Sequence, residues 1–514
     1  MAADVAAAVD YRLKLESPDE AALFYINSQY VELCLELWYN ILCMKIHKTK
    51  REKMSKTSNL RKNDIVKITI EDVNINGDGI GRFNGIAIFV PKSAVGDHVE
   101  VKIIKEAKNY LVGKVEKYIK SSCDRIECDC SYYSRCGGCA FRHISYPAEL
   151  KIKEKHVSDC LARIGGFKNL QIEKILGSEK IIGYRNKAQI PFGKDKDGNV
   201  ISGFFASRSH NISNCESCKL HPEVFDDITK HIKTWMVAND ILPYDEFSHS
   251  GTVRHVYIRS NSDCSEIMVC LVINHGKKFN PKNLVEFLTS EFKNITGIVL
   301  NYNTEKTNVI LGKNFKTLYG KNYITDNLCN LKFNISPESF YQINHNQTEK
   351  LYNLAIEYAE LKKEQNLIDF YCGIGTIGMT MAHQLNHVTG TEIVPKAIEN
   401  AKENAKINNI NNIDFVCSDS TEIIKNISAK NSNYDVVVVD PPRKGCSEKF
   451  IENLVEIFPD TIVYISCNPA TLSKDLKKLF ELTDSYQFKK ICPVDLFPRT
   501  KHVETIVVLK KSTN

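Results

Sequence analysis

A cysteine stands at the end of a short apolar run near the C-terminus of the chain. The run from Ile462 to Ile465 is rich in β-branched residues and is stopped by Asn468 and Pro469, which predicts a buried strand followed by Cys467. Open α/β sheets bind their ligands at that end of a strand. A helix should begin directly afterwards, and the positive end of its dipole would lower the pKa of the thiol. Cys467 is therefore a candidate nucleophile, and a small buried core residue is the alternative.

Two further strand ends carry carboxylates that suit such a thiol. In YDVVVVDPPRKG a buried strand ends in Asp440, and the prolines turn the chain so that Asp440 and Arg443 face the crevice. In LFPRTKHVETIVVL, His502 and Glu504 stand at the start of a last strand. A thiolate that adds to C6 of uracil makes C5 nucleophilic enough to take a methyl group, and a base must then remove the C5 proton. We expect Glu504 to be this base, with His502 as the substitute. The alternative is that Glu504 is an ordinary surface carboxylate on a strand.

A glycine-rich turn earlier in the chain predicts a ligand-binding loop. Gly373, Gly375 and Gly378 follow a strand and open a helix, a pattern that lets the backbone approach a ligand closely. The next strand ends in Glu392, an acid that can hold ribose hydroxyls, and the one after it ends at Asp419, which can meet an adenine amine. Both S-adenosylmethionine and NAD fit this pattern. The thiol on a neighbouring strand favours a methyltransferase, because a nicotinamide enzyme has no evident need for it.

A group of cysteines between these patterns and the N-terminus indicates a metal site. Cys130, Cys136 and Cys139 form a C-x5-C-x2-C set with two glycines in the short gap. Three sulfurs within ten residues are hard to explain as core packing. A four-thiolate site needs one more ligand, for which we choose Cys218, with Cys215 in reserve. Zinc and a 4Fe-4S cluster both fit four thiolates, although a single CxxC pair is less typical of zinc.

Hydrophobic patterning predicts three folded parts in the 514 residues. Residues 59–118 hold short alternating strands between glycine turns, which is typical of a small OB-like β-barrel. Residues 119–330 mix helices and strands in an α+β pattern. Residues 331–514 alternate strand and helix as in a doubly wound α/β sheet. Residues 1–58 are expected to form an N-terminal extension and a basic linker.

Composition excludes some classes of protein. The chain is 43% hydrophobic, carries a net charge of +6 and has no apolar run near the roughly 20 residues that cross a membrane. Its 18 irregularly spaced cysteines, with no secretory signal, indicate a reducing compartment. We therefore expect a cytoplasmic protein, most simply a monomer, whose mild positive charge permits a nucleic-acid partner.

Several motifs together resemble the RNA 5-methyluridine methyltransferases, a family that joins a TRAM barrel, an iron–sulfur central domain and a Rossmann-like catalytic domain. The resemblance covers residues 60–514. It is carried by NGDGIGRFNG, the cysteine set at 130, 136 and 139, SFYQINHNQTEKLY, DFYCGIGTIG, DPPRKG, SCNPATLSKDL and HVET.

The resemblance implies a role for each matching residue. Cys467 would be the nucleophile and Glu504 the base. The S-adenosylmethionine pocket would be lined by Gln342, Tyr371, Thr376, Glu392 and Asp440, beside the turn of Gly373 and Gly375, and we add Asp419 to this set. The cluster would be 4Fe-4S, held by Cys130, Cys136, Cys139 and Cys218, and residues 140–175 would pack on the catalytic domain. Asp440 would hydrogen-bond the uracil edge and so select against cytosine.

The substrate would be a flipped uridine in structured RNA, for which 23S rRNA is our choice and a tRNA T-loop uridine the alternative. Two other classes of protein also fit the sequence. A non-catalytic RNA-binding or ribosome-assembly factor would use the barrel without needing Cys467 or Glu504. A nicotinamide oxidoreductase would use the glycine turn and the cluster.

Overall fold

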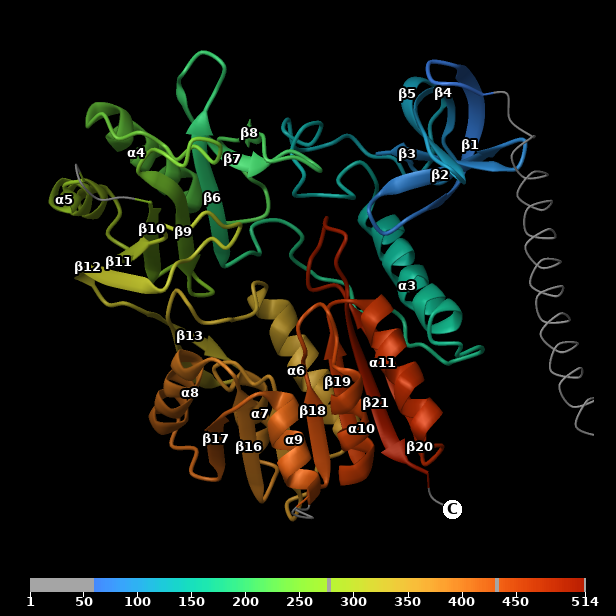
Figure 1. Cartoon of the computed structure of the whole chain (residues 1–514), viewed down its shortest axis with the longest axis vertical. Coiled ribbons are helices and arrows are strands. Elements are labelled where there is room, and N and C mark those ends of the chain that lie inside the picture. The colour runs from blue at the N-terminus through green and yellow to red at the C-terminus, as the bar shows by residue number, and fades with distance from the viewer. Residues whose placement is uncertain (1–59, 275–278, 430–433, 513–514) are drawn as a thin grey trace, which may run out of the picture.

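The computed structural model describes residues 60–274, 279–429 and 434–512, so the extension and linker predicted at residues 1–58 lie outside it. Three folded parts surround a central junction (Figure 1). The blue β-barrel and the green central part lie side by side, and the orange and red C-terminal part lies below them. No helix among the described residues is both long and apolar enough to span a bilayer.

The first part is a closed five-stranded barrel with strand order β1-β2-β3-β5-β4. Its strands are β1 (Ile65–Val73), β2 (Asp78–Phe83), β3 (Ile86–Pro91), β4 (His98–Glu106) and β5 (Tyr110–Lys120). Apolar side chains alternate inward along these strands, as the period-two pattern predicts for a sheet with one buried face. The predicted N-terminal barrel is thus confirmed.

The central part is a seven-stranded sheet of order β12-β11-β10-β9-β6-β7-β8. It contains β6 (Lys187–Lys194), β7 (Val200–Phe205), β8 (Ile212–Asn214), β9 (Val253–Ser260), β10 (Ile267–Ile273), β11 (Ile295–Tyr302) and β12 (Asn314–Gly320), with α4 (Glu223–Ala238) and α5 (Pro281–Glu291). One apolar core joins the two helices to β10, whose seven residues are all buried. A hairpin of β13 (Ile324–Leu328) and β14 (Leu331–Ile335) leads on to α6 (His345–Ala359).

The C-terminal part is a second seven-stranded sheet of order β17-β16-β15-β18-β19-β21-β20. Its strands are β15 (Asn366–Phe370), β16 (His387–Glu392), β17 (Ile413–Cys417), β18 (Val436–Val439), β19 (Thr461–Ser466), β20 (Tyr486–Val494) and β21 (Glu504–Lys511). Its helices are α7 (Thr376–Ala382), α8 (Pro395–Ile407), α9 (Ser420–Ala429), α10 (Glu448–Ile457) and α11 (Pro469–Leu482). The first five strands are parallel and β21 is antiparallel to β19, which confirms the predicted Rossmann-like architecture.

One helix touches both the barrel and the C-terminal part. The helix α3 (Tyr146–Arg163) begins at Ser145, whose side chain accepts the N–H of Ala148. Ala148 belongs to the apolar core of the barrel, while Val157 and Leu161 belong to the core of the C-terminal sheet. In Figure 1, α3 lies between the barrel and α11.

Candidate active site and cysteine cavity

The ends of three strands bring the proposed nucleophile and base together. Ser466, the last residue of β19, is paired with Thr505 of β21, so Cys467 and Glu504 are the next residues at the same edge of the sheet. β18 lies on the other side of β19 and ends directly before Asp440. Cys467 is half-buried and Glu504 is only 3% exposed. Asp440 and Glu504 act electrostatically on Cys467, and Asp440 acts on Glu504, so the three side chains lie close together at this edge of the sheet, which we call the crevice.

The resting state of Cys467 differs from our expectation. The pKa of the thiol is raised to about 11, mainly by burial and then by the carboxylates of Glu504 and Asp440, while the Arg443 guanidinium acts to lower it. The helix α11 does begin immediately afterwards, but its dipole does not prevail. The prediction that the pKa of Cys467 is lowered is therefore wrong for the free protein, because desolvation and two acids oppose the charge.

The pKa values of the Glu504 and Asp440 carboxyl groups are both raised. Burial raises the pKa of Glu504 well above its usual value, and Asp440 adds to the shift. Burial also raises the pKa of Asp440 to about 7. The Oε2 atom of Glu504 is buried and has no hydrogen-bond partner within the described part of the chain. His502 has its pKa lowered to about 4 by burial and by nearby cations, so it is the weaker base of the two candidates.

The loop that carries Arg443 is fastened to the helix that follows Cys467. The carbonyl of Arg443 accepts the side-chain N–H of Asn468 (3.0 Å) and the hydroxyl of Thr471 (3.3 Å). Asp475 of α11 accepts the backbone N–H of Cys446 (2.7 Å). The motif DPPRKG indicated only that Arg443 faces the crevice, and the structure adds that it opposes the carboxylates around Cys467.

The glycine turn after β15 forms an open cradle beside a carboxylate. Glu392 accepts the backbone N–H groups of Gly373 (3.2 Å) and Val394 (3.0 Å). Gly373 has a φ of 56°, and no atom lies within 4 Å of the point where a side chain would begin. Beyond Glu392, Ile393 is 61% exposed. This combination of open backbone, acid and uncovered apolar side chain fits a nucleoside.

The other residues assigned to the cofactor lie around this turn. Tyr371 adopts a φ of 64°, and the hydroxyl of Thr376 hydrogen-bonds that of Tyr352 at 2.9 Å. Gly375 has a φ of 82° and precedes α7. Asp419 is exposed before α9 and accepts the N–H of Thr421 (2.8 Å).

Two residues near the cradle lie deeper in the protein. Gln342 is buried, and its backbone carbonyl accepts the side-chain N–H of Asn186 from the central part (3.0 Å). Sequence reasoning missed Asp369, which is fully buried and accepts the N–H of Gly378 at 2.9 Å. Burial raises the pKa of Asp369 to about 8, with Asp440 and Glu392 contributing. Its place at the head of the DFYCGIG motif was the available signal.

The four cysteines assigned to a cluster line one cavity. The cavity has a volume of about 230 Å³ and is walled by Cys130, Cys136, Cys139 and Cys218, with Cys215 beside them. Cationic side chains share the wall, namely Arg142, Arg185, Lys187 and Lys219. Among the described residues, no group of three or more His, Cys, Asp and Glu side chains is arranged to hold a metal ion. The sulfurs thus surround a volume and do not converge on one point.

The two candidates for the fourth ligand differ in their surroundings. Burial acts to raise the pKa of the Cys218 thiol, but the hydrogen bond and charge of His221, with the backbone of Leu220, together give a net lowering. Burial raises the pKa of Cys215, whose thiol donates to the carbonyl of Ser217 at 3.4 Å. Cys218 is therefore the better thiolate of the pair.

Comparison with known proteins gives consistent matches. Residues 280–512 match the family model of tRNA (uracil-5-)-methyltransferases, and residues 60–115 match that of the TRAM domain. A Clostridium tetani protein described as an RNA methyltransferase is 43% identical over 456 residues, which are 89% of this chain and 98% of that protein. A Halalkalibacterium halodurans protein of the same description is 41% identical over 451 residues, 88% of this chain and 98% of the relative.

One solved structure is similar over most of the chain. It is the Pyrococcus abyssi tRNA (uracil-54, C5)-methyltransferase in complex with S-adenosyl-L-homocysteine. It is 28% identical with a TM-score of 0.68, and the match covers 86% of this chain and 99% of that one.

Proposed function

Because the chain belongs to the RNA 5-methyluridine methyltransferase family, we propose that it methylates C5 of a uridine in structured RNA through a covalent bond between Cys467 and uracil C6. The observation that carries the proposal is the meeting of Cys467, Asp440 and Glu504 at one sheet edge. The open cradle at Gly373 and Glu392, on the same edge, supports S-adenosylmethionine as the methyl donor, which supplies an electrophilic methyl group when bound.

The raised pKa values suggest how protons move. The Cys467 sulfur bonds to C6 of the flipped uracil, and its proton passes to Asp440, whose pKa of about 7 suits it to receive one. Protonated Asp440 can then donate to O4, where negative charge develops. Cytosine carries an amino group at that position, so the same contact favours uracil.

Glu504 completes the reaction. After C5 has taken the methyl group, Glu504 removes the C5 proton, the C5–C6 double bond forms again and the bond between C6 and sulfur breaks. The thiolate then recovers its proton from Asp440. The raised pKa of Glu504 makes it a stronger base than an exposed carboxylate.

We also propose that Cys130, Cys136, Cys139 and Cys218 hold a 4Fe-4S cluster. The proposal is supported by the four cysteines lining one cavity. The Arg142 guanidinium beside Cys139 would offset the negative charge of the thiolates. When bound, the cluster would supply iron–thiolate bonds that fix the segment from Cys130 to Cys139, and no step of methyl transfer needs it.

The target RNA has two candidates. We keep 23S rRNA as the first and a tRNA uridine as the second, which is supported by the tRNA substrate of the similar Pyrococcus abyssi enzyme. Mapping 5-methyluridine in rRNA and tRNA from a strain that lacks the gene would decide between them. A cytoplasmic monomer stays our prediction for the state of the protein.

The test of the mechanism is Glu504→Gln. The variant should form the covalent RNA adduct and transfer the methyl group but release product at least 100-fold more slowly, because removing a positioned base costs roughly 10²–10⁴-fold. Denaturing gels of protein with labelled RNA would show the trapped adduct. His502→Gln is the matched variant and should turn over without trapping. Wild-type turnover of Glu504→Gln would remove Glu504 as the base, and absence of methyl transfer to any RNA would favour the non-catalytic class.

A further inference from the structure

The loop that leads to Glu504 is held mainly by residues from other parts of the chain. This loop, residues 495–503, joins β20 to β21 and rises from the red sheet towards the junction of the three parts (Figure 1). The carbonyl of Arg499 accepts the backbone N–H groups of Ala140 (2.9 Å) and Phe141 (3.2 Å). The carbonyl of Pro498 accepts the hydroxyl of Tyr184 at 3.0 Å.

Buried charges make a second set of bonds between this loop and α3. Lys153 donates to Glu149 (2.8 Å), to Asp495 (2.7 Å) and to the carbonyl of Phe497 (3.1 Å). The side chains of Lys153, Glu149 and Asp495 are all 0% exposed. An ammonium group has three protons, and each has an acceptor here.

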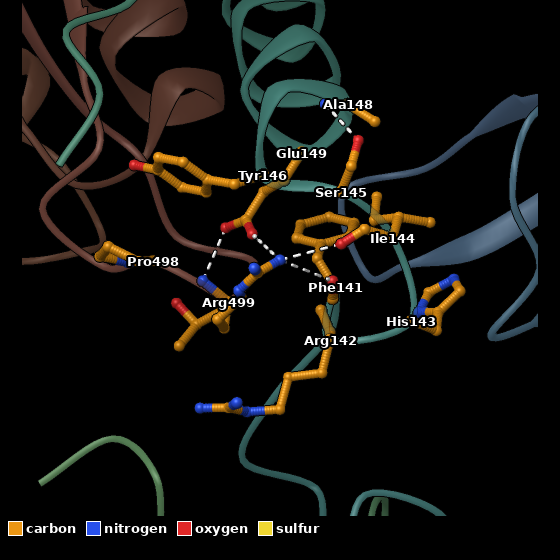
Figure 2. A network of polar contacts seen from close by, with 12 residues as sticks. Phe141, Arg142, His143, Ile144, Ser145, Tyr146, Ala148, Glu149, Pro498 and Arg499 are labelled. Carbon is orange, nitrogen blue, oxygen red and sulfur yellow. Dashed lines mark hydrogen bonds and ion pairs between the residues drawn. The ribbon is translucent and has the colours of Figure 1, made fainter. Parts of the chain in front are cut away.

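Arg499 closes the network from the loop side. Its backbone N–H donates to Glu149 at 2.7 Å, and its guanidinium donates to the carbonyl of Ile144 at 2.9 Å (Figure 2). Tyr146 donates to the second oxygen of Asp495 at 2.7 Å. In Figure 2, Glu149 and Arg499 point towards each other below the start of α3, with the barrel on the other side of residues 141–145.

Glu504 needs such external support. Its free oxygen, Oε2, has no hydrogen-bond partner among the described residues, so its carboxylate is positioned largely by the backbone that carries it. That backbone begins where the loop ends. On the other side of the network, Ala140 directly follows Cys139, which lines the cysteine cavity. One hydrogen-bonded step therefore separates the cysteine segment from the loop of the proposed base.

Buried hydrogen bonds between charged groups fix the orientation of the groups they join more than they add to the free energy of unfolding. A buried ion network is often no more stable than well-packed apolar side chains of the same volume. Apolar packing would hold α3 on the sheet but would leave the loop free to shift along the contact. The directional bonds of Lys153 and Arg499 instead define where the loop backbone lies.

We propose that Tyr146, Glu149, Lys153, Asp495 and Arg499 are positioning residues that transmit the placement of the cysteine segment to Glu504. This inference rests on the proposed function, in which Glu504 removes the C5 proton. It predicts that damage to the network slows the last step of the reaction, while formation of the covalent adduct continues.

Two variants of different severity test the proposal. Lys153→Met should slow turnover roughly 100-fold, the effect of a misplacement of about 1 Å, and Tyr146→Phe should slow it less. Both should accumulate the adduct of Cys467 with RNA, using whichever in vitro transcript, 23S rRNA or tRNA, the wild type methylates. Simple destabilisation would reduce the amount of active protein without raising the trapped fraction. Where Lys153→Met does not fold, Tyr146→Phe alone decides.

Asp97→Asn is the matched control. Asp97 is also 0% exposed and pairs with Arg125 at 2.6 Å, but it belongs to the barrel part, where it accepts the backbone N–H groups of Ala94 and Ser122. It should not raise the trapped fraction. Equal trapping by Asp97→Asn, or the absence of trapping in folded Lys153→Met and Tyr146→Phe, would overturn the proposal.

Two further measurements separate the possible failures. Glu504→Gln is run in parallel: if it traps adduct and the network variants do not, the positioning proposal fails while the proposed function stands. If Glu504→Gln traps nothing and turns over normally, the base assignment itself fails. Hydrogen exchange gives a readout independent of activity: Cys139→Ser should speed amide exchange in residues 495–503, and unchanged exchange there would contradict the link to the cysteine segment.

Discussion

Two regions of this protein, the cysteine cavity and the crevice around Cys467, place charges of opposite sign beside their sulfurs. In the cysteine cavity, four cationic side chains share the wall with the thiols. In the crevice, Cys467 faces the carboxyl groups of Asp440 and Glu504, with Arg443 as the opposing cation. Burial raises the thiol pKa in both places, to about 12 for Cys139 and to about 11 for Cys467. The regions therefore differ in the sign of the charges beside their sulfurs.

That difference matches two uses of sulfur. Cationic neighbours would offset the negative charge of thiolates that bond to iron. Burial and acidic neighbours raise the pKa of Cys467, and a thiol is much less prone to oxidation than a thiolate. Such an arrangement would protect the nucleophile at rest, with Asp440 ready to take its proton when a uracil ring enters.

The largest expected effect comes from removing the crevice thiol. Cys467→Ala should lower turnover by about 10⁴-fold or more, because no other group can bond to C6, as with loss of a nucleophile in other covalent enzymes. The melting temperature and S-adenosylmethionine affinity should stay near those of the wild type. Radiolabelled methyl transfer, differential scanning calorimetry and isothermal titration would measure the three quantities. Residual turnover within tenfold of the wild type would mean that Cys467 forms no essential bond.

The second effect separates two cysteines that line the same cavity. Cys218→Ser should reduce bound iron and acid-labile sulfide to a small fraction of the wild-type content, because the better thiolate is lost. Cys215→Ser should retain the cluster. Anaerobic purification followed by iron and sulfide analysis would make the comparison. If Cys215→Ser loses the cluster and Cys218→Ser retains it, Cys215 is the fourth ligand. If the protein contains zinc and no iron, the 4Fe-4S assignment is wrong.

The third effect concerns the cation that opposes the acids. Arg443→Met should raise the pKa of Cys467 further, and turnover near pH 7.5 should fall in proportion to the thiolate fraction, about tenfold if that pKa rises by one. Because the pKa of the thiol is about 11, the loss should stay nearly constant between pH 7 and pH 9 and should shrink only as pH approaches 11. Lys444→Met, a change at the exposed neighbouring residue, is the control and should leave the pH profile in place. A loss in Arg443→Met that is matched by an equal loss of RNA affinity would indicate a role in RNA binding instead.

Sequence patterns predicted the arrangement of the strands and of the site residues better than they predicted the pKa of Cys467. The strand and helix periods predicted the N-terminal barrel and the doubly wound sheet, and strand ends predicted that Cys467, Asp440 and Glu504 would meet. The protonation of Cys467 was mispredicted, because a local helix dipole is visible in sequence while burial and neighbouring acids are not. The contact of Lys153 with Asp495 joins residues far apart in the chain, and neither carries a motif.

The smallest expected effect lies behind the crevice, at Asp369. Its native pKa is about 8, whereas an unfolded aspartate titrates near 3.9, so between these values the native state holds one proton more than the unfolded state. The stabilisation from that proton is fully present below pH ~3.9 and is lost as pH rises through 8. Asp369→Asn does not titrate but can still accept the N–H of Gly378. The wild type should therefore lose stability relative to Asp369→Asn by about 1.4 kcal/mol per pH unit between roughly pH 5 and pH 7. Unfolding of both proteins at several pH values would measure the difference, and parallel stability curves would mean that the buried carboxyl is already ionised.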